Sequence, residues 1–133
     1  RDWDRALTPE VAGFIEARDS FYLATASADG QPYVQHRGGP AGFVQILGPT
    51  TLAFPDFGGN RQYITVGNLS ENPRVMLFFM DYPHRRRLKL WGTATVEEGP
   101  DGRRIAIDVE AWDRNCPQHI TPRYTAAEWA EQA

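Results

Sequence analysis

Residues 58–62 are Gly-Gly-Asn-Arg-Gln and lie between an expected strand and an expected helix. The N-terminus of a helix offers free backbone N–H groups and a partial positive charge, so it attracts anions. Glycines let the backbone approach a phosphate, and the guanidinium of Arg61 can add a bidentate contact. The segment therefore suggests a phosphate loop. Taken alone, an ordinary glycine turn capped by Asn60 explains it equally simply.

Cys116 and His119 are the next residues whose side chains could take part in a reaction or bind a metal. A nucleophilic thiolate needs an activating base, and a metal site needs several ligands, yet the chain has one cysteine and three histidines. Because histidine titrates near neutral pH, His36 and His119 are candidates for proton transfer. We assign no metal site and leave the catalytic residues otherwise unknown. In the plainer interpretation, Cys116 shapes a turn.

Composition limits the partners and the compartment. The net charge is −3 and the pI about 5.6, so the run Arg85-Arg86-Arg87 is interpreted as a solvated hairpin tip rather than a nucleic-acid site. No apolar run approaches the roughly 20 residues that span a bilayer, so we expect no membrane partner. A single cysteine cannot form an internal disulfide, which favours a cytoplasmic protein.

Periodicity and turn signals predict the elements that position these residues. Thr8-Pro9-Glu10 is typical of a helix start, and this helix is expected to run over about 8–18. Dipeptides such as Asp29-Gly30 predict hairpin turns. The expected strands are 21–27, 33–36, 43–47, 51–54, 74–81 and 87–96. The other expected helices are 61–69, 103–110 and a truncated one from about 126.

Two of these strands carry further information. Within the expected strand 74–81, residues 75–80 are continuously apolar, which predicts burial on both faces. In 87–96, Leu88 and Leu90 share one face while Arg87 and Lys89 share the other. We therefore expect residues 1–133 to form a single, mainly β domain, a closed or nearly closed six-stranded antiparallel barrel with flanking helices.

Four strings in this order resemble a known family. They are Gly30-Gln31-Pro32-Tyr33, Phe54-Pro55-Asp56-Phe57-Gly58-Gly59-Asn60-Arg61, Asn72-Pro73-Arg74-Val75 and Arg87-Leu88-Lys89-Leu90-Trp91-Gly92. Over residues 14–96 they are similar to the first hairpin, the phosphate loop and the two following strands of the FMN-binding split-barrel family typified by pyridoxamine 5′-phosphate oxidase. The resemblance implies a Greek-key-type split barrel that binds FMN.

The resemblance also implies a homodimer with two FMN sites at the subunit interface. The flavin ring and ribityl chain would lie along Gln35, His36, Arg37 and Gly38. The phosphate and ribityl hydroxyls would meet Phe54, Asp56, Asn60, Arg61 and Gln62. Arg87 would reach the cofactor from the other subunit, with Lys89 beside it and Gln118 as a flavin or substrate contact.

The chain departs from the oxidase pattern where substrate binds. The oxidase's phosphate-binding arginine on the second strand is Gln35 here, and its nearby lysine falls on Pro40. The oxidase's C-terminal Arg-Leu-x-Pro string is absent. We therefore expect an FMN-dependent oxidoreductase acting on another small molecule, not a pyridoxine phosphate oxidase. The alternatives are a non-catalytic flavin carrier, sensor or electron-transfer module, or a barrel that binds haem or a deazaflavin.

Overall fold

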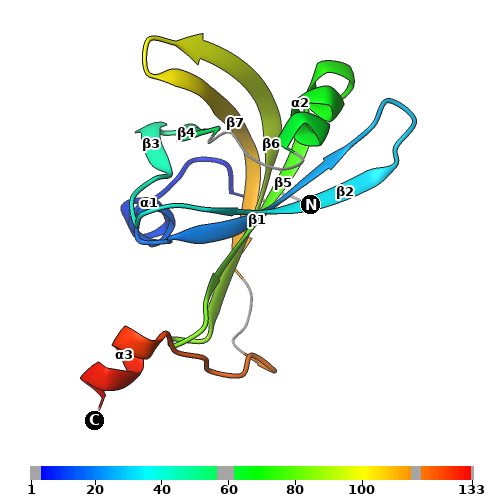
Figure 1. The fold of residues 1–133 in the computed structure, drawn as a ribbon. Coiled ribbons are helices and arrows are strands. Elements are labelled where there is room, and N and C mark those ends of the chain that lie inside the picture. The colour runs from blue at the N-terminus through cyan, green and yellow to red at the C-terminus, as the bar shows by residue number, and fades with distance from the viewer. Residues whose placement is uncertain (1–3, 57–61, 115–117, 133) are drawn as a thin grey trace.

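The computed structural model describes residues 4–56, 62–114 and 118–132, and only the backbone of residues 62 and 63. Within these ranges the chain forms one curved antiparallel sheet and three helices (Figure 1). In chain order the elements are α1 Pro9–Glu16, β1 Ser20–Ala26, β2 Pro32–Gly38, β3 Gln45–Gly48, β4 Thr51–Pro55, α2 Gln62–Glu71, β5 Arg74–Asp81, β6 Arg86–Gly99, β7 Gly102–Arg114 and α3 Ala126–Glu131.

The seven strands pair in the order β2-β1-β5-β6-β7-β4-β3. The prediction of a mainly β, antiparallel fold is confirmed. The expected six strands become seven in the described residues because residues 103–110, predicted as a helix, belong to strand β7. There Ile105, Ile107 and Val109 are buried at every second position, which is the period of a strand and not of a helix.

The core lies inside the curve of the sheet. The ring of Phe21 on β1 packs against Phe54 of β4 and Phe79 of β5, with ring centroids 4.9 and 5.2 Å apart. Helix α1 begins at Pro9 after the Thr8 cap, whose side chain accepts a hydrogen bond from the backbone N–H of Val11, and it packs Val11 into this core. The core therefore brings together side chains from strands near the two ends of the strand order.

Each long strand has one buried face and one half-exposed face. On β6, Leu88, Leu90 and Ala94 are buried and Arg87 and Lys89 are not, so the predicted alternation is confirmed. Strand β5 alternates in the same way, so the predicted burial on both faces is wrong for a single chain. The half-exposed face carries apolar side chains that a second layer could cover.

Close backbone packing bends the sheet where β6 meets β7. The register shifts between Trp91 and Gly92, and a Cβ at Gly92 would lie 2.3 Å from the carbonyl oxygen of Asp108. Only glycine fits this approach. In the described ranges, no helix is long and apolar enough to cross a membrane.

Candidate functional site

A buried ion pair connects two strands that lie near opposite ends of the sheet. The Nη1 group of Arg37 on β2 donates to Oδ1 of Asp56, directly after β4, at 2.8 Å. Both side chains are only 4% exposed. Arg37 faces the interior because it lies opposite Phe21 in the β1–β2 ladder. The pair therefore joins β2, an end strand, to β4, the second strand from the other end.

Gln35 extends this network to helix α2. Its Oε1 accepts hydrogen bonds from Nε of Arg37 and from Oγ1 of Thr65, each at 2.9 Å. Thr65 is fully buried in α2. A second bond, from Nδ2 of Asn68 to Oγ1 of Thr25 at 3.0 Å, fixes the same helix to β1. The start of α2 is therefore held close to β2 by polar side chains.

Arg103 on β7 is a second cation close to Asp56. Its Nη1 lies 3.7 Å from Oδ2 of Asp56, and its Nε donates to Oε1 of Glu98 at 3.0 Å. The hydrogen bond and charge of Glu98 raise the pKa of Arg103, and the charge of Asp56 adds to the effect. Asp56 thus lies between two permanently charged guanidinium groups. Its carboxylate therefore links Arg37 to Arg103.

One donor of this network remains unused. The Nη2 group of Arg37 is buried, yet no hydrogen-bond partner for it is present in the described residues. A buried, unsatisfied donor costs about 1–3 kcal/mol, so a native structure that carries one calls for an explanation. An acceptor oxygen from a bound ligand would supply the missing partner. The network can therefore hold an anionic or carbonyl-bearing cofactor.

A second group of predicted site residues lies on the opposite face of the sheet. His36, Tyr22, Phe78 and Lys89 are successive neighbours across β2, β1, β5 and β6. At roughly 4.8 Å per strand, His36 and Lys89 are about 14 Å apart. Arg87, on the same face, has a buried Nε without a partner in the described chain. Neither Arg87 nor Lys89 makes an ion pair with a described residue.

The remaining predicted residues lie in different surroundings. Phe54 is 1% exposed, and its ring is 5.8 Å from Cζ of Arg37, so it supports the network from the core. Gly38 is the exposed last residue of β2. Gln118 and His119 are exposed, and His119 has a φ of 68°, in the segment whose Ile120 carbonyl accepts from Nε of Arg85. The described hydrogen bonds of Arg37 go to Gln35 and Asp56, not to that segment.

The centre of the predicted phosphate loop cannot be compared with the structure. Asn60, Arg61 and Cys116 lie outside the described residues, and Gln62 is described only as the first residue of α2. Sequence analysis missed Thr65 and Arg103. A polar residue on a helix gives no signal of its partner, and Arg103 fell in the segment predicted as a helix. In the described ranges, no three His, Cys, Asp or Glu side chains cluster as metal ligands.

The sequence profile of the family described as pyridoxamine 5′-phosphate oxidase matches residues 7–123. No curated protein sequence matches the chain significantly. Among solved structures, a Lactobacillus delbrueckii protein of the pyridoxamine 5′-phosphate oxidase type superposes with a TM-score of 0.66. The two sequences are 22% identical over 83% of this chain and 95% of that one.

Other solved structures with this fold belong to proteins whose names refer to different ligands. An F420 reductase is 22% identical, with a TM-score of 0.58, over 80% of this chain and 98% of that one. An FMN-binding protein from Syntrophomonas wolfei is 10% identical, with a TM-score of 0.58, over 80% and 87%. HutZ, the haem storage protein of Vibrio cholerae, is 18% identical, with a TM-score of 0.56, over 81% and 94%. At these identities the likeness shows the fold alone.

The buried ion pair generates a prediction about stability. Arg37→Met leaves the carboxylate of Asp56 buried with only the distant Arg103, so we expect unfolding to become easier by about 3–5 kcal/mol. The double variant Arg37→Met/Asp56→Leu should regain much of this loss, because no buried charge remains unpaired. Urea denaturation followed by circular dichroism measures both.

The matched control is Arg104→Met, which removes the exposed pair with Glu97. An exposed pair contributes about 0–1 kcal/mol, so this variant should remain close to the parent protein. Equal losses for Arg37→Met and Arg104→Met would contradict a structural role for the buried pair.

Proposed function

The chain belongs to the pyridoxamine 5′-phosphate oxidase family, and from this premise we propose that it binds FMN and uses it for redox chemistry on a small molecule. The unused, buried Nη2 donor of Arg37 carries the proposal, because it lies in a network that also fixes the start of α2. The donors available there, a guanidinium and an edge strand, suit a ligand rich in phosphate and carbonyl oxygens.

The residues of β2 would hold and orient the cofactor. Strand β2 is at the end of the strand order and pairs with β1 on one side. An edge strand offers backbone N–H and C=O groups to a ligand, and these suit the polar edge of a flavin. The Gln35–Thr65 hydrogen bond keeps this strand and α2 at a fixed separation. The phosphate would lie at residues 58–62, as the sequence motif predicts.

The two-sided arrangement of the site residues favours a homodimer. Gln35, Arg37 and Asp56 face the interior, whereas Arg87 and Lys89 lie on the other side of the sheet. Because the sheet lies between the two groups of one chain, the Arg87 and Lys89 that reach the cofactor would come from the half-exposed face of a second copy, as the resemblance implies. Tyr22, 41% exposed, and Val34, 61% exposed, make that face apolar enough for such contact.

The proposed activity is that of an oxidoreductase without an assigned acid or base. When bound, FMN supplies hydride or electron transfer, and the protein contributes grip, orientation and electrostatics. His36 contacts Tyr22, with ring centroids 5.6 Å apart, and is exposed on the dimer face. It is the described histidine best placed to move a proton near a ligand at that face. His119 remains a candidate by its residue type alone.

Substitution in the phosphate loop tests the cofactor. We expect Arg61→Ala to lower the affinity for FMN by about tenfold or more, because a charge-assisted contact contributes roughly 1.5–3 kcal/mol. Fluorescence quenching of FMN on titration with the protein gives the dissociation constant. Arg74→Ala is the matched control, since Arg74 is an exposed arginine at the start of β5.

Protein that takes up no added FMN would refute the proposal. A Soret band after haem addition would instead favour the haem alternative, and binding of a deazaflavin alone would favour that cofactor. If FMN binds but neither NADH nor NADPH reduces it anaerobically, the result favours a flavin carrier or sensor over an enzyme.

The dimer has its own test. Tyr22→Asp places a charge at the centre of the half-exposed face, so we expect light scattering to show a monomer with weakened FMN binding. Leu47→Asp is the control, because Leu47 is 46% exposed on β3, away from that face. A parent protein that is monomeric and still binds FMN tightly would rule out the shared site.

A further inference from the structure

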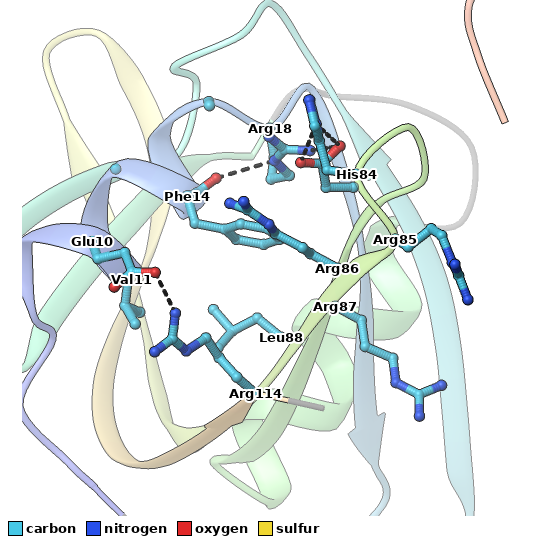
Figure 2. Close-up of a pocket in the computed structure, with 13 residues that line it drawn as sticks. Glu10, Val11, Phe14, Arg18, His84, Arg85, Arg86, Arg87, Leu88 and Arg114 are labelled. Atoms are coloured by element: carbon cyan, nitrogen blue, oxygen red, sulfur yellow. Dashed lines mark hydrogen bonds and ion pairs between the residues drawn. The ribbon is translucent and has the colours of Figure 1, made fainter. Parts of the chain in front are cut away.

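A cavity of about 540 Å³ lies between helix α1 and the end of the β5–β6 hairpin. Val11 and Phe14 of α1 and Leu88 of β6 form its apolar wall (Figure 2). The charged residues that line it are Glu10, Arg18, Asp81, Arg85, Arg86, Arg87 and Arg114. Small-molecule sites usually measure about 300–1,000 Å³ and combine apolar walls with a few placed polar groups. This cavity has both properties, and no residue of the Arg37 network lines it.

Two of these arginines, Arg18 and Arg114, form ion pairs with carboxylates that also line the cavity. Nε of Arg18 donates to the carbonyl of Phe14 at 3.1 Å, and its Nη1 lies 3.5 Å from Oδ1 of Asp81. Asp81, which is 7% exposed, also contacts the ring of His84 at 3.0 Å. Nη1 of Arg114 is hydrogen-bonded to Glu10. These contacts fix the rim of the cavity and compensate the charges of Arg18 and Arg114.

Arg86 also lines the cavity. It makes no ion pair or hydrogen bond to a side chain in the described ranges, and its guanidinium extends into the cavity towards Phe14 (Figure 2). Arg85 and Arg87 extend away from the cavity in the same view. Strand alternation explains the difference, because Arg86 shares its side of β6 with the buried Leu88. Arg86 therefore presents an exposed guanidinium, without a side-chain partner in the described residues, beside an apolar wall.

The aromatic ring of Phe14 defines the shape of a suitable ligand. Cζ of Arg18 lies 4.6 Å from the ring centroid, so one part of the ring is already stacked against a cation. An apolar, flat body could continue this layer, with its oxyanion turned to Arg86. Guanidinium groups bind carboxylates and phosphates through paired N–H donors.

We propose that this cavity binds a small organic anion with a flat apolar body, of the aryl carboxylate or aryl phosphate class. The site shares one residue with the proposed FMN site, Arg87, whose side chain extends away from the cavity, and is otherwise separate from it. Leu88 and Arg86 lie on the side of β6 opposite Lys89, so the cavity opens away from the face on which a second copy would pack. Ligand and FMN can therefore occupy the protein together.

Calorimetric titration of the FMN-loaded protein with 1-naphthyl phosphate tests the site. We expect saturable binding with a dissociation constant in the millimolar range or below, and much weaker binding of the neutral 1-naphthylmethanol. Arg86→Gln should weaken binding of 1-naphthyl phosphate by about tenfold or more, because it removes a charge-assisted contact. Arg74→Gln makes the same charge change on the exposed end of β5 and should leave the constant unchanged.

Gly13→Leu separates binding from stability. Gly13 lines the cavity, and a Cβ at this position meets no atom within 4 Å. The leucine side chain should therefore fill the cavity and abolish binding, while the melting temperature stays the same or rises because glycine is a poor helix former. Loss of binding in a protein that is at least as stable cannot be attributed to unfolding.

Three results would overturn the proposal. The first is no saturable heat at millimolar 1-naphthyl phosphate. The second is binding that persists in both Arg86→Gln and Gly13→Leu. The third is release of fluorescent FMN in proportion to ligand bound, which would place the ligand at the flavin site.

Discussion

The ion pair between Arg37 and Asp56 is the contact on which the arrangement of this fold most depends. In the sheet, β2 lies at one end of the strand order and β4 lies near the other end. Four strands separate them, so strand pairing connects them only indirectly. The buried pair adds a direct bond across that separation. Desolvating two charges is costly, so such a pair is retained only with good geometry and further hydrogen bonds, which Gln35 and Arg103 supply.

Helix α2 depends on the same polar residues. Among the described side chains of α2, Leu69 is the one strongly buried hydrophobic residue. Thr65 is also buried, and its hydroxyl donates a hydrogen bond to Gln35. The helix is therefore placed by hydrogen bonds more than by an apolar stripe. Such bonds are directional, so they fix the helix start at a defined position relative to β2.

The sheet separates the molecule into two chemical surfaces. Its inner side holds the core and the Arg37 network, and its outer side carries His36, Arg87 and Lys89 among half-exposed apolar residues. The α1 cavity lies on the inner side of β6, where Arg86 and Leu88 point. Strand alternation thus assigns neighbouring arginines of one basic run to different surroundings.

The sequence by itself determined most of the elements, the mainly β class and the family. Turn signals and alternation are local, so the two faces of β6 and the N-cap of α1 were predictable. Residues 103–110 were predicted as a helix and form part of strand β7, although Ile105, Ile107 and Val109 carry a strand period. Only the tertiary structure decided that Arg37 meets Asp56, that Thr65 and Arg103 join them, and that the predicted cofactor residues divide between two faces. These contacts join residues far apart in the chain, and the curvature that brings them together comes from the packing of the whole sheet.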